Sequence, residues 1–294
     1  MDTYLKKAET LIETLSYIQS FRGSTTVIKF GGSVLEDKEL AYKTLKDIVF
    51  LECVGMKPVI VHGGGKSITA RLKELEIETK FINGQRYTCE KSVKVVDDVL
   101  HNDVNKFIVE TITELKGKAI TLSGKDIFSV QKAKPTQTEN GEYADLGFVG
   151  DIYHVDTKKI NYLLDKDIIP VITPLGLDFN SYIYNINADI AAAETAEALK
   201  ARKLLFISDV PGILLDPKDE TSRISTINIK DINQFISKGI ISGGMIPKIN
   251  SAAKALKAGT NKVHMIDGRT PHSILLEIFT TSGVGTQILK DNSY

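Results

Sequence analysis

Hydrophobic residues along this chain follow two alternating patterns. Short continuous apolar runs, typical of strands buried on both faces, are separated by segments in which apolar residues recur at helical spacing. The runs predict strands at 25–30, 57–62, 119–124, 168–176, 203–210 and 262–268. The helical spacing predicts helices at 38–55, 67–76, 90–115, 188–201, 247–259 and 273–281, with a shorter one near 229–238. This alternation predicts an α/β fold, a three-layer αβα sandwich around a largely parallel central sheet.

Residues 125–155 interrupt the alternation. A proline, the Asn140-Gly141 pair and short alternating stretches predict a β-hairpin excursion here rather than another helix. We expect it to stand over the carboxyl ends of the strands, where open α/β sheets bind ligands. We also expect two lobes, at 24–180 and 181–294.

Residues 1–23 have a pattern of their own. Apolar residues at helical spacing predict an N-terminal amphipathic helix that stops near Gly23 and presents Leu5, Ala8, Leu11, Ile12, Leu15 and Ile18 on one face. Charges interrupt every apolar run, so this segment does not read as a signal peptide, and no segment has the length of a membrane span. The apolar face packs either on its own subunit or on another.

Composition excludes several classes of function. The 37 basic and 37 acidic residues cancel, so no global field attracts the protein to nucleic acid or to an anionic membrane. The function is therefore expected at a local site. Cys53 and Cys89 lack the spacing of a metal site, which predicts two reduced thiols and a cytoplasmic location.

The stretch VIVHGGGKS (59–67) ends like a nucleotide-binding P-loop. A P-loop requires glycine where this chain has Ile60, inside an apolar run that predicts a strand. A strand followed by glycines and a helix still leaves free backbone N–H groups at a helix N-terminus, and such groups favour an anion. A dinucleotide-dependent dehydrogenase is disfavoured, because KFGGSVLED after the first strand lacks GxGxxG.

Two lysines lie where an anion would bind. Lys29 precedes Gly31-Gly32 at the end of the first strand, so its ammonium group and the glycine amides are expected to converge. The alternative is an ordinary lysine at an exposed strand end. Lys248 is expected in the first turn of a helix whose first position is Pro247. The positive end of the helix dipole disfavours a cation there, which indicates a nearby anion such as phosphate.

Other polar residues are less specific. Arg86 follows a turn-forming Asn-Gly pair, and its guanidinium suits a carboxylate, although a surface arginine fits the pattern equally well. Asn185, Asn187 and Asp189 precede a helix, where they serve either as capping residues or as ligands. SDVPGIL (208–214) ends a strand in a polar turn that suits a nucleotide, as many strand exits do.

A series of segments across residues 29–286 carries a resemblance. In chain order they are KFGGS, HGGGK, NGQR, LGFVGDI, YNINADIAAAETAEAL, KLLFISDVPGIL, SGGMIPK, HMIDGR and LLEIFTTSGVGT. Together they resemble the acetylglutamate kinases of the amino acid kinase family. KxGG and the SDVPGI turn are common to several kinases of that family, whereas NGxR, NINAD and GGMIPK in combination are far more specific.

The resemblance implies ATP-dependent phosphorylation of the side-chain carboxylate of N-acetyl-L-glutamate, the second step of arginine biosynthesis. Mg²⁺ is expected mainly on ATP oxygens and water, so no protein ligand to the metal is predicted. Lys29 and Lys248 would stabilise the phosphoryl group in transit, and Asp189 would hold them in place. The residues implied for N-acetylglutamate are Gly64, Gly65, Arg86, Asn185 and Asn187. Those implied for ATP are Gly31, Gly32, Ser208, Asp209, Gly212, Ser242, Gly243 and Gly244.

The two ends of the chain resemble arginine-sensitive members, in which the N-terminal helix interlaces dimers into a hexameric ring. The resemblance implies feedback inhibition by arginine and a homo-oligomer, a dimer or a hexamer built as a trimer of dimers. The residues implied near the effector are Tyr17, Glu277, Gly283 and Gly285. Ser16 and Gln19 stand where the family more often has Pro and Arg, which leaves the affinity for the inhibitor open. Whether a PII-type protein docks on the chain also stays open.

Two other functions stay open. A related kinase for an aminoadipate derivative would use the same Arg86 and Asn185. A non-catalytic arginine sensor would be expected to lack Lys29, Asp189 or Lys248, and all of these are present.

Overall fold

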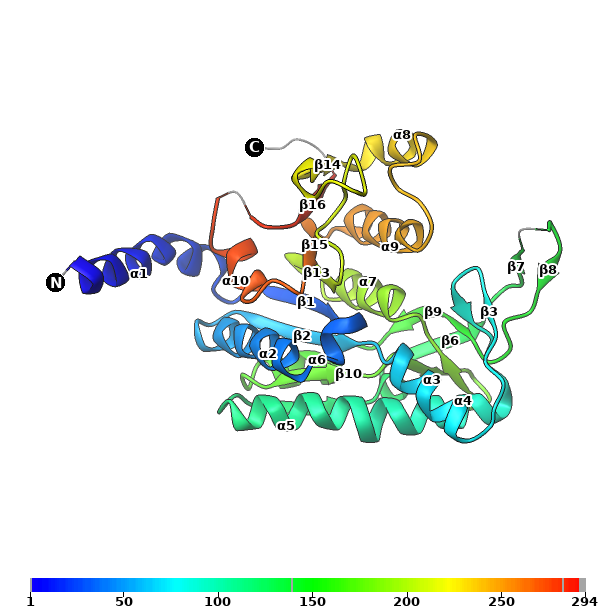
Figure 1. The fold of residues 1–294 in the computed structure, drawn as a ribbon. Helices are drawn as coiled ribbons and strands as arrows, with labels where there is room; N and C mark the ends of the chain where they lie inside the picture. Colours follow the sequence, from blue (N-terminus) through cyan, green and yellow to red (C-terminus); the bar gives the residue numbers. More distant parts are fainter. Residues whose placement is uncertain (1, 139, 282, 291–294) are drawn as a thin grey trace.

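The computed structural model describes residues 2–138, 140–281 and 283–290. Within these ranges the chain folds in three layers, with an eight-stranded sheet between two layers of helices (Figure 1). The predicted αβα sandwich is confirmed. No described helix is both long and apolar enough to cross a membrane.

The central sheet is largely parallel. Its strand order is β14-β16-β15-β13-β1-β2-β10-β5, and only β15 and β16 pair antiparallel. The bounds are β1 Thr25–Phe30, β2 Lys57–His62, β5 Ala119–Leu122, β10 Ile169–Ile172, β13 Lys203–Ser208, β14 Thr226–Asn228, β15 Lys262–Asp267 and β16 Thr286–Leu289. The carboxyl ends of β1, β2, β10, β13 and β15 therefore meet at one edge of the sheet.

Successive side chains of β1 and β2 point into two different cores, because a strand alternates its side chains between faces. Val27 and Val59 belong to the core covered by α6, α7, α8 and α9. Ile28 and Ile60 belong to the core covered by α2, α3, α5 and α10. The bounds are α2 Lys38–Cys53, α3 Gly65–Glu74, α6 Lys158–Leu164, α7 Ala188–Ala198, α8 Ile232–Ser237, α9 Met245–Ala258 and α10 Ser273–Ile278. Burial on both faces explains why these strands are continuous apolar runs.

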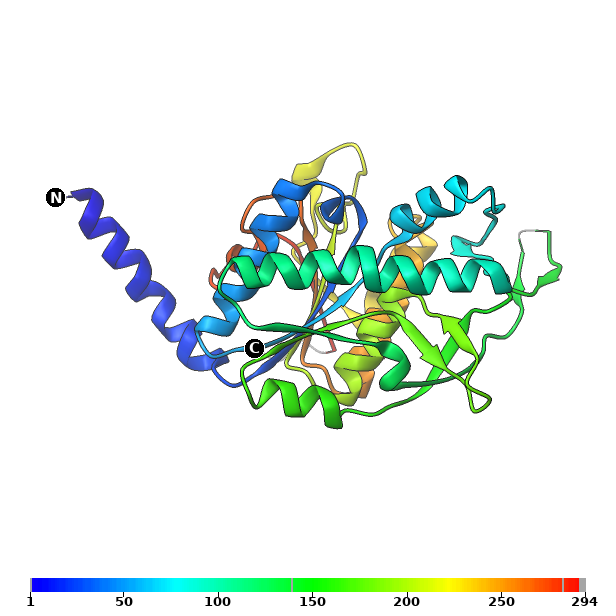
Figure 2. The same ribbon diagram turned by 90° about the horizontal axis from the view of Figure 1, so that it is seen from below.

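One long helical rod crosses the outer face of the second core (Figure 2). It consists of α4 Glu90–Asp98, the π-helical segment η2 Val99–Asn105 and α5 Lys106–Glu114. A π segment carries an extra residue relative to an α-helix, and such segments are frequent at functional sites. The sequence predicted helix here but not the π geometry.

A smaller sheet stands over the carboxyl edge. Its order is β12-β11-β6-β9, with bounds β6 Phe128–Lys132, β9 Gly150–Val155, β11 Leu175–Leu177 and β12 Ile183–Asn185. Two hairpins extend nearby, β3 Phe81–Ile82 with β4 Gln85–Arg86, and β7 Thr136–Gln137 with β8 Tyr143–Ala144. The predicted excursion at 125–155 is confirmed. The single strand predicted at 168–176 is wrong, because Pro174 lacks the N–H that a continuous ladder needs and the chain changes sheets there.

The N-terminal helix α1 (Asp2–Phe21) extends away from the rest of the molecule (Figure 1). Its last turns pack on the core through Tyr17, Ile18 and Phe21, whereas Leu11 and Ile12 are 67% and 69% exposed. The helix ends before Gly23, whose φ of 75° breaks helical geometry. The predicted helix and its stop are confirmed. The division into lobes near residue 180 stays a prediction, since the central sheet takes strands from both sides of it.

Candidate active site

Lys29, Asp189 and Lys248 form one ion-paired group, the lysine–aspartate cluster. Lys29 Nζ lies 3.0 Å from Asp189 Oδ1, and Lys248 Nζ donates to Asp189 Oδ2 at 2.8 Å. The three residues come from the end of β1, the first turn of α7 and the first turn of α9. Lys29 is only 8% exposed, so the alternative of an ordinary exposed lysine is wrong.

The cluster carries an excess of positive charge in a poorly solvated place. Burial lowers the pKa of Lys29, although the Asp189 carboxylate acts in the opposite direction. Burial disfavours the charge of Asp189, yet the two lysines hold its pKa below the ordinary value. Two ammonium groups facing one carboxylate leave a net charge that an anion can neutralise.

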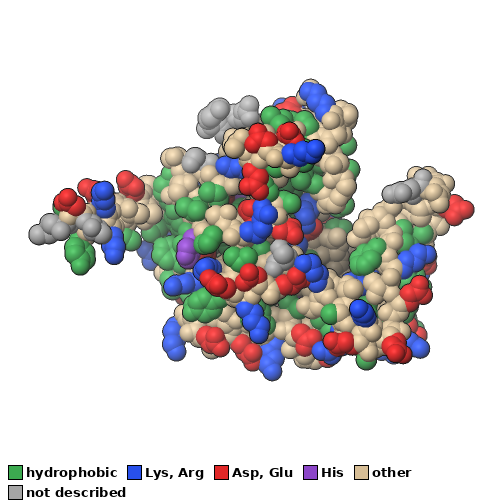
Figure 3. Space-filling view, in the orientation of Figure 1, with side chains coloured by type: hydrophobic (Ala, Val, Ile, Leu, Met, Phe, Trp, Pro, Cys, Tyr) green, Lys and Arg blue, Asp and Glu red, His purple; other side chains and the backbone are tan. Residues whose placement is uncertain are grey.

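A cavity of about 420 Å³ lies beside the cluster. Its lining includes Lys29 and Asp189, together with Gly63, Gly64, Gly65, Arg86, Asn185 and Asn187. Figure 3 shows the surface recessed between the region of α9 and the arm formed by β7 and β8. The structure thus brings the predicted acyl-substrate residues together around one space.

The glycine segment Gly63–Gly65 joins β2 to α3 at the wall of this cavity. Helix α3 begins at Gly65, two residues earlier than predicted, and its N-cap Gly64 provides no side-chain cap. The first amides of the helix therefore stay available to a ligand. A Cβ on Gly64 would lie 2.9 Å from Leu100 Cδ2, so glycine permits the close approach of η2.

Arg86 is a buried cation without a carboxylate partner among the described residues. Its Nη2 donates to Gly65 O at 2.8 Å and to Thr69 Oγ1 at 2.6 Å, and the guanidinium lies over the Phe81 ring. Its Nη1 is buried and has no hydrogen-bond partner in the described structure. Burial lowers the pKa of Arg86. At 8% exposure it is not the ordinary surface arginine that the sequence left open.

Asn185 and Asn187 have different local roles. Asn187 Oδ1 accepts from Asp189 N at 2.8 Å and Ile190 N at 3.3 Å, so it caps α7. The capping interpretation is therefore correct for Asn187, which also lines the cavity. Asn185 Nδ2 donates to Thr88 Oγ1 at 3.4 Å, and Asn185 lines the same cavity.

The residues predicted for ATP lie mainly outside this cavity. Among them only Gly32 belongs to its lining. Strand β1, with Lys29, lies between β2, which leads to the glycine segment, and β13, which leads to Ser208 and Asp209. The lysine–aspartate cluster is therefore interposed between the two sets. The other residues of the second set are Gly31, Gly212, Ser242, Gly243 and Gly244, the last three directly before α9.

One local prediction near Lys248 is wrong. Helix α9 begins at Met245, so Pro247 occupies its third position rather than its first. Proline fits there because the amides of the first turn have no intrahelical acceptor to lose. Lys248 still lies in the first turn, as predicted.

The four residues predicted near an effector gather where α1 meets α10. Tyr17 stacks edge-on against Phe279 at 6.5 Å between centroids. Glu277 Oε2 accepts from Val284 N at 2.7 Å and from Gly285 N at 2.8 Å. Gly283 has φ of 60° and approaches the same carboxylate closely.

Sequence reasoning missed a buried series of contacts that joins Glu277 to His264 and His264 to Lys203. His264 Nδ1 lies 2.6 Å from Glu277 Oε1, and Lys203 Nζ lies 3.3 Å from His264 Nε2. Burial lowers the pKa of His264 to about 4 and that of Lys203 to about 8. The available signal was a polar residue inside each of two apolar strand patterns, KLLFIS and KVHMID.

The amino-acid sequence is similar to those of known proteins over nearly its whole length. Residues 24–267 match the sequence model of the Amino acid kinase family. An acetylglutamate kinase of Carboxydothermus hydrogenoformans is 47% identical over 292 residues, covering 98% of this chain and 99% of its own length. One from Brachyspira hyodysenteriae is 46% identical and covers 97% of both chains.

A solved structure supports the fold. The N-acetylglutamate synthase from Neisseria gonorrhoeae, complexed with coenzyme A and N-acetyl-glutamate, has a TM-score of 0.84 and 24% sequence identity. The match covers 97% of this chain and 63% of that longer one. The resemblance predicted from the motifs is confirmed by the sequence relatives: this chain belongs to the amino acid kinase family, and within it to the acetylglutamate kinases.

Proposed function

We propose that this chain transfers the γ-phosphoryl group of ATP to the side-chain carboxylate of N-acetyl-L-glutamate. The observation that carries the proposal is the pairing of two features in one space. Arg86 is a buried guanidinium with a free Nη1, and the cavity that it lines shares a wall with the lysine–aspartate cluster. The first feature suits a carboxylate and the second a phosphoryl group.

Substrate binding follows from the lining. Arg86 would hold the α-carboxylate of N-acetylglutamate, since a guanidinium pairs with a carboxylate in a fixed orientation. Asn185 and the amides of Gly64 and Gly65 would contact the remaining polar groups. With one end held, the side-chain carboxylate extends toward Lys29. ATP would enter from the β13 side, so its γ-phosphate approaches the cluster from the opposite direction.

The transfer needs no general base. The side-chain carboxylate, with an ordinary pKa of about 4.3, is already ionised at neutral pH. One of its oxygens forms a bond to the γ-phosphorus while the bond from that phosphorus to the β,γ-bridging oxygen breaks, releasing ADP. Lys29 and Lys248 offset negative charge on the phosphoryl group, and Asp189 holds both ammonium groups in place.

Mg²⁺ fits this site as part of the nucleotide. Each oxygen of Asp189 lies within 3.0 Å of a lysine nitrogen. No group of three or more His, Cys, Asp or Glu side chains is placed to hold a metal within the described ranges. We therefore assign the metal to ATP oxygens and water, where it would neutralise phosphate charge.

We also propose how the enzyme is regulated and how its subunits assemble. We assign an arginine effector to the junction of α1 and α10, around Tyr17, Glu277, Gly283 and Gly285. The exposed apolar residues of α1 support its packing on another subunit in a hexamer built as a trimer of dimers. We also propose a cytoplasmic location, in line with the two free cysteines of the described chain.

Hydroxylamine trapping of an acyl phosphate tests the activity. The panel is Mg-ATP with N-acetylglutamate, N-acetyl-aminoadipate or glutamate, each with and without arginine. We expect trapped product from N-acetylglutamate alone, and less of it with arginine. Preferential product from the aminoadipate derivative would assign the related kinase activity instead. Arginine binding without product from any substrate would establish the sensor and contradict the kinase.

A further inference from the structure

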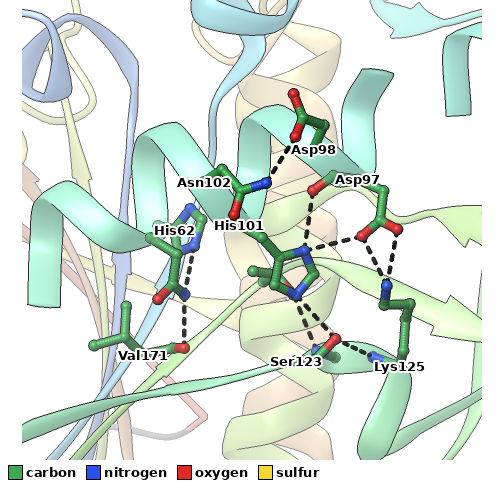
Figure 4. A network of polar contacts seen from close by, with 11 residues as sticks. His62, Asp97, Asp98, His101, Asn102, Ser123, Lys125 and Val171 are labelled. Carbon is green, nitrogen blue, oxygen red and sulfur yellow. Dashed lines mark hydrogen bonds and ion pairs between the residues drawn. The ribbon is translucent and has the colours of Figure 1, made fainter. Parts of the chain in front are cut away.

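His62 is a buried polar residue to which the catalytic account gives no role. It is the last residue of β2, directly before the glycine segment, and it is fully buried. Its Nδ1 lies 3.0 Å from Gly63 O, and its Nε2 lies 3.0 Å from Nδ2 of Asn105. Figure 4 shows His62 beside the helical rod, on the side of Val171.

The contacts of Asn105 determine which nitrogen of His62 carries the proton. Asn105 Nδ2 also donates to Val171 O at 2.8 Å, and Asn105 Oδ1 accepts from Thr121 Oγ1 at 2.6 Å. A flipped amide would set two oxygens against each other at Val171. Since an amide nitrogen only donates, His62 Nε2 must accept and Nδ1 must carry the proton. Burial lowers the pKa of His62 to about 4, so the ring is neutral near pH 7.

The protonated Nδ1 then donates to Gly63 O. This carbonyl and the N–H of Gly64 are opposite ends of one planar trans peptide, so fixing the first fixes the direction of the second. Gly64 lines the cavity, whereas His62 and Asn105 do not. A hydrogen bond made inside the core therefore fixes the orientation of the Gly64 N–H, a donor in a residue of the candidate substrate site.

The π-helical segment η2 supplies both supports of this peptide. Asn105 is its last residue, and Leu100 and Val104 of the same segment would lie 2.9 Å and 3.4 Å from a Cβ on Gly64. An α-helical turn is one residue shorter, so it would rotate Asn105 or Leu100 by about 100° around the helix axis. The π geometry therefore lets one segment place Asn105 against His62 and Leu100 against Gly64.

We infer that His62 and Asn105 are positioning residues, which hold the Gly63–Gly64 peptide so that the Gly64 N–H points at the acyl substrate. The inference rests on the proposed function for the identity of that substrate. It concerns affinity for the acyl substrate rather than the phosphoryl-transfer step, because neither residue lines the cavity.

The rest of the network in Figure 4 provides a matched control. His101 Nε2 lies 3.0 Å from Ser123 Oγ, and its Nδ1 lies 2.9 Å from a carboxylate oxygen of Asp97, which also pairs with Lys125. His101 lies on the same π-helical segment, but none of its hydrogen bonds within the described residues reaches Gly63 or Gly64. Its loss should change stability without changing substrate affinity.

Four variants separate positioning from folding. His62→Gln retains an acceptor for Asn105 but loses the donor to Gly63, and we expect it to raise KM for N-acetylglutamate about tenfold. Asn105→Leu should do the same. His62→Asn retains a donor at the Nδ1 position and should raise KM by about threefold or less. His101→Gln should leave KM unchanged, and all four should leave KM for ATP unchanged. An unchanged KM for N-acetylglutamate in His62→Gln would overturn the inference.

Nitrogen-15 NMR of histidine-labelled wild-type protein tests the same inference without any variant. We expect a neutral His62 ring with its proton on Nδ1, and a proton on Nε2 would overturn the positioning role. This result does not depend on turnover. A wild type that lacks activity toward N-acetylglutamate but has the Nδ1 proton would contradict the proposed function and leave the support of Gly64 standing.

Discussion

Asp189 is the residue through which the candidate site is organised. Its two carboxylate oxygens face one lysine each, and those lysines come from a strand and a helix far apart in the sequence. Its own backbone N–H is fixed by Asn187. A buried carboxylate of this kind keeps two like charges close together, and we expect both ammonium groups to face the phosphoryl group.

His264 offers a prediction about pH at the residue scale. Its pKa is about 4 in the folded chain, against an ordinary value of 6.5. Between these values the unfolded chain binds a proton that the folded chain does not, so the free energy of unfolding should rise with pH up to about 6.5. The slope from this one group is at most about 1.4 kcal/mol per pH unit.

Urea unfolding at pH 5.0 to 6.5 measures this slope in wild type and in His264→Gln. The variant keeps His62, which contributes in the same direction, so the difference between the two slopes isolates His264. We expect the shallower slope in the variant. Equal slopes would show that His264 is protonated in the folded protein.

How well single residues could be predicted depended on the motif around them. Lys29, Asp189 and Lys248 each lie next to a sequence feature with a physical meaning, a glycine pair, a cap or a helix start. Lys203 and His264 have no such feature, because the pairing of β13 with β15 brings them together and Glu277 reaches His264 from α10. Arg86 was ambiguous because its sequence does not reveal burial.

Helix α7 connects a side-chain cap to the lysine–aspartate cluster. Asn187 caps it, and the capped first turn carries Asp189. Helix α2 has an equivalent cap, since Asp37 accepts from Glu39 N at 2.9 Å and Leu40 N at 3.1 Å, yet that turn holds none of the predicted catalytic residues. The two caps allow stability and function to be separated.

Asn187→Ala and Asp37→Ala should each lower the free energy of unfolding by about 1 kcal/mol, because each removes a side-chain cap. Only Asn187→Ala should also lower kcat, by about tenfold or more, because a small displacement of Asp189 misplaces both lysines. Urea unfolding and steady-state kinetics on both variants check this. A comparable loss of kcat in Asp37→Ala would show that the effect is general destabilisation.

At the scale of elements, the period of the apolar pattern was sufficient for most strands and helices. It missed helix α6 (Lys158–Leu164), which no predicted range covers, and it was insufficient for three further features. The π-helical segment differs from an α-helix by one residue, which a period of 3.6 tolerates. The break at Pro174 lies inside an apolar run. Strands β14 and β16 have only three and four residues, too few for a long buried pattern, and β14 is the edge strand of the sheet.

At the scale of the whole molecule, the first half of α1 protrudes from the described structure (Figure 1). Its outer residues include Tyr4, Leu11 and Ile12, each more than 60% exposed. In the last turns of the same helix, Tyr17 contacts Phe279, which is two residues after Glu277, and Glu277 Oε2 accepts from Val284 N and Gly285 N. Assembly and effector binding are therefore expected to share this helix.

Deleting residues 1–20 should reduce a hexamer to a dimer and weaken inhibition by arginine, while turnover without arginine stays within about twofold of wild type. Light scattering after size exclusion gives the mass, and the hydroxylamine assay gives the inhibition. A truncated protein that stays hexameric and fully arginine-sensitive would contradict the assignment of α1.

The most direct test of the account compares turnover in two lysine variants of helix α9. Lys248 pairs with Asp189, and Lys254 on the same helix pairs with Glu194, so both lysines join α9 to α7 by an ion pair. Lys248→Met should lower kcat about a hundredfold or more, because it removes a cation aimed at the phosphoryl group. Lys254→Met should keep kcat within about twofold, because the Lys254 side chain is 55% exposed and its partner Glu194 belongs neither to the lysine–aspartate cluster nor to the cavity lining. A Lys248→Met protein that folds and turns over like Lys254→Met would contradict the account.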